Sequence, residues 1–283
     1  MGGALRYGVT LPMYRTFYRL RESPFNVTSD PSFLYLSPTH TEALDHLTYG
    51  IEQRKGFLAI TGEIGAGKTT LCRALINRLD SRCKVALILN AILPETQLLE
   101  AIVDDFGIVS EKRTKGALIK KLNRFLLEQL SLGNNTVLII DEAQNMRSST
   151  LETIRMLSNL ETEKEKLLQI VLVGQPQLKD KLNSPELVQL KQRIAVRFHI
   201  RALNEREVAR YIEHRLTVAG SDGRIVFDQG AVYRIFSHSG GIPRLINILA
   251  DKALLLGFVR ETFTLDRALI EQCIKELEGE GIA

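Results

Sequence analysis

Continuous apolar runs alternate with amphipathic segments through the first two thirds of the chain. The apolar runs predict strands at 57–61, 85–89, 137–140, 170–173 and 194–200. Between them, apolar residues recur at helical spacing, which predicts helices at about 40–54, 68–79, 95–107, 115–131 and 149–160. Strands that are apolar without alternation, and that are separated by amphipathic helices, are typical of a parallel sheet buried on both faces. We therefore expect an α/β fold with a parallel five-stranded sheet between helices.

The strand pattern stops after Leu203, and helix-start signals take its place. Residues suited to open helices are Asn204, Asp228, Pro243 and Thr264. Asn204 stands three residues before Glu207, the spacing of a capping box, and Gly220 is placed to end that first helix. The pattern predicts a small all-helical lid domain after the α/β domain.

These signals divide the chain into four parts. We expect an N-terminal arm at 1–23, the α/β domain at 24–203, the helical lid at 204–278 and a tail at 279–283. The arm has little periodicity, which indicates a mobile segment, and Met13 is an alternative start to Met1.

Composition and charge narrow the class of protein. The chain has 283 residues, of which 45% are hydrophobic and 25% charged, with a net charge of +4. These values exclude a largely disordered or membrane-embedded chain. Its three cysteines lack the paired spacing of a zinc site or a disulfide framework, which favours a reducing cytoplasm. Arginines near the start either are solvated or face an acidic lipid surface or nucleic acid: Arg6, Arg15, Arg19 and Arg21.

A phosphate-binding motif lies between the strand 57–61 and the helix that follows. It comprises Gly62, Glu63, Ile64, Gly65, Ala66, Gly67, Lys68 and Thr69, with Thr70 next. The pattern G-x-x-x-x-G-K-[ST] forms a tight loop whose N–H groups surround phosphates at the positive end of a helix. We expect Lys68 to reach the β- and γ-phosphates and the Thr69 hydroxyl to bind Mg²⁺. The alternative, a glycine-rich structural turn, is disfavoured by the strand before the motif and the helix after it.

Two carboxylates follow the strand 137–140. Asp141 is expected at the carboxyl edge of the sheet beside the phosphate loop, where it would hold Mg²⁺. Glu142 is placed to act as general base on the attacking water. Adjacent acids after a strand are commonly a solvated turn, but a phosphate loop upstream favours the catalytic interpretation.

Four further polar residues are candidates for the same site. Gln175 follows the strand 170–173 and would orient the water or contact the γ-phosphate; otherwise it is a loop glutamine. Arg193 ends a predicted helix and would point at a neighbour's γ-phosphate; a surface salt bridge is the alternative. Arg244 opens a helix of the second domain, where a cation is unfavourable unless an anion binds. Asn90 ends the second strand and is a candidate to hold Glu142.

The motifs together resemble those of AAA+ ATPases. Beside the phosphate loop and VLIIDE, the segments are LVGQPQL, LKQRIAVRFHI and SGGIPRLIN. The opening, residues 17–70, resembles the ATPase domain of ExeA-type general secretion pathway A proteins, and the resemblance covers about residues 14–275.

The resemblance implies a role for each candidate residue. It implies Walker A at Lys68 and Thr69, Walker B at Asp141 and Glu142, sensor 1 at Gln175, an arginine finger at Arg193, sensor 2 at Arg244, and adenine contacts at Phe25 and Tyr35. The expected cofactors are ATP and Mg²⁺, bound at a core/lid cleft that a neighbouring subunit completes in a ring or filament. Gln175 departs from the Asn or Thr common at its position in the wider superfamily.

Two biological settings follow from the resemblance. The first is ATP-driven assembly or remodelling in an envelope secretion pathway, in the cytoplasm or at the inner membrane, with a membrane-anchored partner. The second is a DNA-binding helper of transposition, for which duplex DNA would be the partner; the modest net charge of +4 weighs against it. ExeA-type proteins continue into a membrane helix and a periplasmic domain, so we expect this chain to be a stand-alone ATPase or the cytoplasmic part of such a protein.

Overall fold

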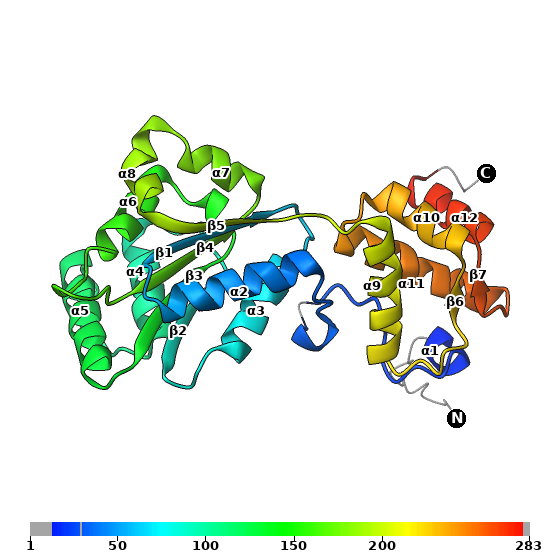
Figure 1. Cartoon of the computed structure of the whole chain (residues 1–283), viewed down its shortest axis with the longest axis horizontal. Coiled ribbons are helices and arrows are strands. Elements are labelled where there is room, and N and C mark those ends of the chain that lie inside the picture. The colour runs from blue at the N-terminus through cyan, green and yellow to red at the C-terminus, as the bar shows by residue number, and fades with distance from the viewer. Residues whose placement is uncertain (1–12, 29, 280–283) are drawn as a thin grey trace, which may run out of the picture. The chain divides into compact units, whose positions relative to one another are not determined.

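The computed structural model describes residues 13–28 and 30–279 and divides the chain into two compact units (Figure 1). The α/β unit runs from Pro38 to Arg201. The helical unit combines the described residues up to Ser37 with those from Ala202 onward. Among the described helices, none has the length and apolar character needed to cross a membrane.

The α/β unit contains five strands and the helices between them. Its strands are β1 (Phe57–Gly62), β2 (Cys83–Ile88), β3 (Asn135–Ile140), β4 (Gln169–Gly174) and β5 (Ile194–Ile200). Its α-helices are α2 (Pro38–Glu52), α3 (Lys68–Arg78), α4 (Glu95–Asp105), α5 (Lys115–Ser131), α6 (Ser148–Leu157), α7 (Pro176–Leu182) and α8 (Val188–Arg193). Short 3₁₀ turns are η2 (Ala143–Asn145) and η3 (Pro185–Leu187). The sequence pattern missed α7.

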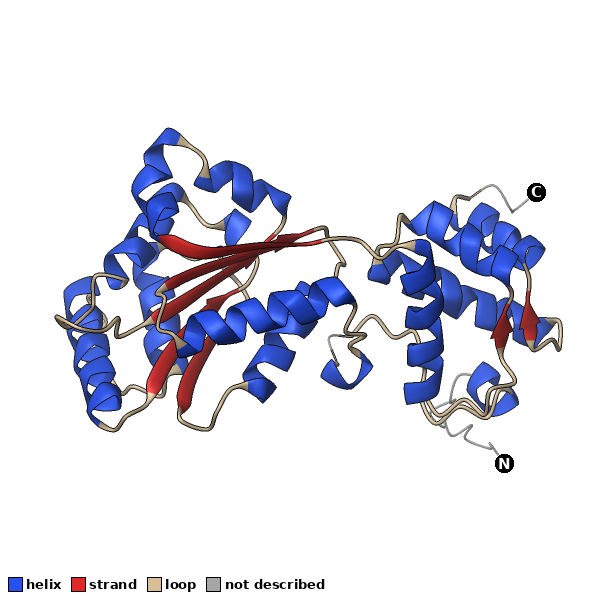
Figure 2. Cartoon of the chain, in the orientation of Figure 1, coloured by secondary structure: helices blue, strands red, loops and turns tan. Residues whose placement is uncertain are grey.

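The five strands form one parallel sheet in the order β2-β3-β4-β1-β5 (Figure 2). The predicted five-stranded parallel sheet is confirmed. Strand β4 lies between β1 and β3, so the ends of all three strands meet at one carboxyl edge. The phosphate loop follows β1 at that edge, and the acidic pair follows β3.

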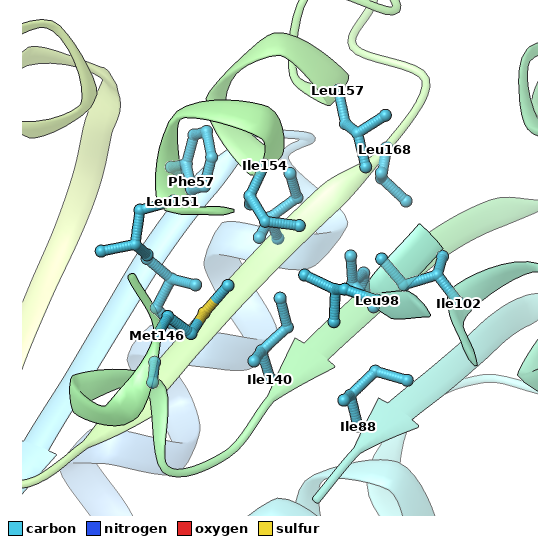
Figure 3. Close-up of a cluster of buried hydrophobic side chains, with 14 of the residues drawn as sticks. Phe57, Ile88, Leu98, Ile102, Ile140, Met146, Leu151, Ile154, Leu157 and Leu168 are labelled. Carbon is cyan, nitrogen blue, oxygen red and sulfur yellow. The ribbon is translucent and has the colours of Figure 1, made fainter. Parts of the chain in front are cut away.

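Alternate side chains of each strand point to opposite faces of the sheet, and a separate core covers each face. Leu58 and Ile60 of β1 belong to the core beneath α2 and α3. Phe57 of β1, Ile88 of β2 and Ile140 of β3 belong to the other core, with side chains of α4 and α6. Figure 3 shows this second cluster, in which the α6 residues labelled are Leu151, Ile154 and Leu157. Burial on both faces explains why the central strands β1, β3 and β4 are almost entirely apolar, whereas the edge strands β2 and β5 carry exposed side chains.

The helical unit contains one short sheet besides its helices. Its elements are α1 (Met13–Phe17), η1 (Pro31–Phe33), α9 (Glu205–Val218), β6 (Val226–Phe227), α10 (Gln229–Ser239), α11 (Pro243–Val259), β7 (Thr264–Leu265) and α12 (Arg267–Leu277). The expectation that no strand follows Leu203 is corrected by the parallel pair β6–β7. Thr264 lies in β7, and the side chain of Asp266 caps α12 instead by accepting from the Leu269 N–H at 2.8 Å. The capping box of Asn204 and Glu207 is present as predicted.

The segment 13–37 packs into the helical unit, which corrects the expected arm at 1–23 and the α/β boundary at residue 24. The Tyr14 hydroxyl donates to Asp251 Oδ1 at 2.6 Å, and the fully buried Tyr18 donates to the Thr262 carbonyl at 3.0 Å. Burial raises the pKa of Tyr18 to about 12. Because these partners lie over 200 positions away, local periodicity could not show that the segment is ordered. Residues 1–12 of the expected arm lie outside the described residues.

Arg215 of α9 is buried and binds the part of this segment that follows Tyr18. Its guanidinium donates to the carbonyls of Pro24 and Asn26, the latter at 2.8 Å, and its Cζ lies 4.5 Å from the centre of the Phe33 ring. Burial lowers the pKa of Arg215. The charged side chain is satisfied by backbone carbonyls and a ring face, so it ties Pro24, Asn26 and Phe33 to α9.

Candidate nucleotide-binding site

The loop after β1 has the backbone of a phosphate cradle. Gly65 and Gly67 have φ of 82° and 87°, the left-handed region that favours glycine. A Cβ at Gly62 would lie 3.1 Å from both Cβ and the carbonyl oxygen of Ile200, so this position requires a small residue. Gly67 caps the N-terminus of α3, which directs the free N–H groups of the first turn toward the loop.

The remaining loop residues differ in exposure. Glu63 and Ile64 are exposed, Ala66 is buried, and Thr70 is half-buried in the first turn of α3. The buried His40 of α2 supports the loop from behind, because its Nε2 lies 3.0 Å from the Ala66 carbonyl oxygen. A carbonyl only accepts, so this contact requires a proton on Nε2. Sequence reasoning missed His40.

Lys68 folds back onto the loop. Its Nζ donates to the carbonyls of Gly62 and Glu63, at 2.8 Å each, and the residue is only 6% exposed. Burial lowers the pKa of Lys68, while the carboxylates of Glu142, Asp141 and Glu63 raise it. Phosphate oxygens placed in the loop would offer the ammonium stronger, charge-assisted hydrogen bonds than these neutral carbonyls.

Thr69 and Asp141 meet across the sheet edge. Thr69 Oγ1 donates to Asp141 Oδ2 at 2.5 Å, and Oδ1 of the same carboxylate accepts from the Glu142 N–H at 2.8 Å. Asp141 is 2% exposed. Two hard oxygens side by side suit Mg²⁺, which takes few protein ligands and completes its shell with water and phosphate oxygens. No group of three or more His, Cys, Asp or Glu side chains able to hold a metal occurs among residues 13–28 and 30–279.

Glu142 begins the turn after β3 and is held by two amides. Its φ is 53°, and its Oε2 accepts from Gln144 Nε2 at 2.5 Å and from Gln175 Nε2 at 3.1 Å. The structure thus brings Gln175 to Glu142, on the edge where both were expected. Gln144 was missed, although the run Asp-Glu-Ala-Gln places an amide two residues after Glu142.

Asn90 makes no hydrogen bond to Glu142, so the structure does not show the expected role of Asn90 as the holder of that carboxylate. Its Oδ1 accepts from the Ile92 N–H at 3.1 Å, and the residue is exposed. Asparagine at a strand end readily turns its side chain onto the backbone two residues on, and here that local bond prevails. Gln144 and Gln175, rather than Asn90, donate hydrogen bonds to the Glu142 carboxylate.

Arg193 lies at the amino ends of the strands, whereas the phosphate loop of the same chain follows β1 at their carboxyl ends. It ends α8, directly before β5, whose start pairs with Phe57 and whose end pairs with Gly62. A seven-residue parallel strand spans about 20 Å. The guanidinium is half-buried and donates from Nη1 to Ser158 Oγ at 3.1 Å. Arg193 therefore cannot serve the Lys68 site of its own chain.

Three site candidates belong to the helical unit. Arg244, in the first turn of α11, is exposed and makes no hydrogen bond or ion pair with the described residues. Tyr35 is half-buried, with its ring 6.0 Å from that of Tyr211. Phe25 is only 2% exposed and packs edge-on against Phe227 at 6.2 Å. The expected adenine contacts of Phe25 and Tyr35 both stay predictions.

The comparison with protein families agrees with this geometry. Residues 51–182, from the end of α2 through α7, match the family described as AAA domain. These residues make up most of the α/β unit, which is therefore similar to an AAA domain. The chain is also 42% identical, over 268 residues, to general secretion pathway protein A of Aeromonas hydrophila. That match covers 94% of this chain and 49% of the relative, so the chain spans about half the length of that protein.

Solved structures with this AAA fold are similar over most of the chain. The ORC2 protein of Aeropyrum pernix matches with a TM-score of 0.67 at 17% identity, covering 93% of this chain and 75% of that one. Drosophila ORC bound to DNA gives 0.65 at 16%, covering 98% and 71%. The Thermotoga maritima RuvB branch migration motor gives 0.56 at 16%, covering 86% and 71%. At such identities the likeness shows the P-loop AAA+ fold alone.

Proposed function

We propose that this protein binds ATP with Mg²⁺ and hydrolyses it. One observation carries the proposal: a phosphate loop with Lys68, a Thr69–Asp141 oxygen pair and the held base Glu142 meet at a single sheet edge. A protein that only bound nucleotide would not need the carboxylate of Glu142, because binding requires no general base.

Each residue has a distinct part in this reaction. ATP with Mg²⁺ supplies the electrophilic γ-phosphorus and a cation that neutralises charge on the phosphate oxygens. Lys68 would exchange its loop carbonyls for β- and γ-phosphate oxygens, and Thr69 and Asp141 would hold the metal. Glu142 accepts the proton of the attacking water. Gln175, which already touches Glu142, orients that water or contacts the γ-phosphate.

A second copy of the chain completes the site. The position of Arg193 at the far edge of the sheet supports its use as a finger on the γ-phosphate of a neighbour, which requires a ring or filament. An arginine supplied in this way is worth about 10³–10⁵ in rate in other nucleotide hydrolases. Arg244, exposed at a helix N-terminus, would bind the phosphates from the helical unit. Isolated copies should hydrolyse slowly.

The biological setting that we propose is an envelope secretion pathway, on the strength of the similarity to general secretion pathway protein A. In that setting ATP drives assembly or remodelling with a membrane-anchored partner, and the chain acts in the cytoplasm or at the inner membrane, where ATP is supplied. The net charge of +4 over 283 residues does not indicate the basic surface that duplex DNA binding needs.

The ATPase rate per subunit, measured against protein concentration with and without duplex DNA, tests the proposal. We expect a rate that rises with concentration, requires Mg²⁺ and ignores DNA. Absence of hydrolysis at every concentration would refute the enzymatic function. A rate that stays low until DNA is added, and falls steeply with salt, would replace the secretion setting by a DNA-dependent one.

A further inference from the structure

The side-chain amide of Gln144 bridges the proposed base and the end of strand β4. Its Nε2 donates to Glu142 Oε2 at 2.5 Å, and its Oε1 accepts from the Gln175 backbone N–H at 3.0 Å. We propose that Gln144 is a positioning residue: it sets the direction of the Glu142 carboxylate and couples it to the β4 end, where Gln175 faces the nucleotide site. This inference rests on the proposed hydrolysis.

The two hydrogen bonds fix which way the amide points. A backbone N–H can only donate, so the atom facing Gln175 N must be the carbonyl oxygen of Gln144. The NH₂ group must then face Glu142, whose ionised carboxylate can only accept. The reversed amide would place two donors together at one end and two acceptors at the other, so only one orientation satisfies both partners.

The surrounding chain keeps the amide in this position. Lys181 of α7 donates from Nζ to the carbonyls of Gln144 and Met146, at 2.5 Å and 2.6 Å, which secures the turn η2. Gly174, the last residue of β4, leaves room for the side chain, because a Cβ there would lie 2.8 Å from Gln144 Oε1. The bridge is therefore supported at the turn that carries it and at the strand it reaches.

The geometry indicates how Gln144 would act during turnover. The Gln175 side chain donates to the same oxygen of Glu142, Oε2. The backbone N–H of Gln175 donates to the side-chain oxygen of Gln144, Oε1. If Gln175 turns toward a γ-phosphate, Gln144 stays as the donor that aims the carboxylate. Gln144 itself need not touch ATP, so its loss should lower kcat and leave ATP binding nearly unchanged.

Two variants separate positioning from mere packing. Gln144→Glu keeps the side-chain shape and the acceptor for Gln175 N–H, but puts a second carboxylate against Glu142. Like charges so close raise the pKa of the pair. Gln144→Ala removes both hydrogen bonds and adds no charge. Asn145→Asp is the matched control, since Asn145 is exposed, makes no side-chain hydrogen bond in the described part of the chain, and receives the same added charge.

The experiment measures kcat against pH, together with the dissociation constant of ATP. For both Gln144 variants we expect kcat to fall at least about tenfold at neutral pH, with the ATP dissociation constant within about twofold of wild type. In Gln144→Glu alone, the acid limb should also move to higher pH by about one unit or more. Asn145→Asp should show neither change.

The outcomes distinguish this inference from the proposed function. A wild-type kcat and pH profile in Gln144→Glu would overturn the positioning role and leave the ATPase proposal standing. If that variant fails to fold, as judged by its melting curve, an unchanged kcat in Gln144→Ala would overturn the role equally. A wild-type protein without hydrolysis would overturn the ATPase function, and the role of Gln144 with it.

Discussion

The hydroxyl of Thr69 donates a 2.5 Å hydrogen bond to the carboxylate of Asp141, although 72 positions separate the two residues. The contact exists because β1 and β3 flank β4 in one parallel sheet, so the loops at their carboxyl ends meet. A pair of oxygens is thus assembled beside the phosphate loop. If Mg²⁺ binds here, the Thr69 hydroxyl and the Asp141 carboxylate would hold the ion in place of this hydrogen bond.

Thr69→Val should abolish most Mg²⁺-dependent hydrolysis. The substitution removes the hydroxyl at nearly constant shape, so we expect kcat to fall about 100-fold, while nucleotide binding in the presence of EDTA is retained. Steady-state hydrolysis titrated with MgCl₂ is the measurement. Thr217→Val, which removes an exposed hydroxyl that bonds only to the Glu213 carbonyl of its own helix, is the control. Wild-type Mg²⁺ dependence in Thr69→Val would contradict the metal assignment.

Lys68→Met should weaken ATP binding without unfolding the protein. It keeps the aliphatic stem and removes an ammonium that burial already disfavours, as the lowered pKa of Lys68 indicates. Losing charge-assisted bonds of about 1.5–3 kcal/mol should raise the ATP dissociation constant about 10- to 100-fold. Titration calorimetry measures this constant, and a melting curve checks the fold. Undiminished affinity would remove Lys68 from the binding site.

Glu142→Gln should uncouple binding from hydrolysis. The variant keeps the length of the side chain but cannot take a proton, so kcat should fall about 10²–10⁴-fold with ATP still bound. Single-turnover hydrolysis beside an equilibrium binding titration makes the comparison. Glu186→Gln, an exposed carboxylate in η3, should behave as wild type. If Glu142→Gln turned over at the wild-type rate, another group would have to be the base.

Arg193→Ala should remove the rise of specific activity with concentration, because the residue lies too far along the sheet to serve its own site. The ATPase rate of a mixture of two variants is a sharper test. Arg193→Ala lacks the arginine and Lys68→Met should bind ATP weakly, so we expect each to show low activity alone. A mixed assembly pairs an intact phosphate loop with an intact arginine and should regain part of the activity. Arg197→Ala removes an exposed arginine of β5 and serves as control. No recovery on mixing, together with normal assembly, would argue against a finger at Arg193.

Tyr18→Ala should destabilise the helical unit strongly. The side chain is fully buried among residues from the C-terminal part of the chain, so its removal should cost about 3–5 kcal/mol of unfolding free energy. Tyr18→Phe removes only the bond to the Thr262 carbonyl and should cost about 1 kcal/mol. Urea unfolding measures both. A mobile arm, as the periodicity of 1–23 suggested, would show no loss for either variant.

The sequence by itself determined the five strands of the α/β unit, most of the helices between them, and most of the chemistry at the sheet edge. Apolar runs predicted all five strands, and those of the central strands are continuous because a sheet covered on both faces needs no polar alternation there. The phosphate loop and the acidic pair were also readable, because each lies within a few residues of a strand end. Parallel strands place such ends on one edge of the sheet, and the order that puts only β4 between β1 and β3 brings Lys68 near Asp141.

Contacts between distant segments were decided only by the tertiary structure. Tyr18 and Arg215 order residues 13–33 through partners that no periodicity connects to them. The choice among Asn90, Gln144 and Gln175 as holders of Glu142 depends on side-chain reach and on the backbone N–H of Gln175, which follows β4 and donates to the Gln144 side chain. Local pattern places a residue on an edge, but which amide reaches a carboxylate there is settled by packing and hydrogen bonding among segments far apart in the chain.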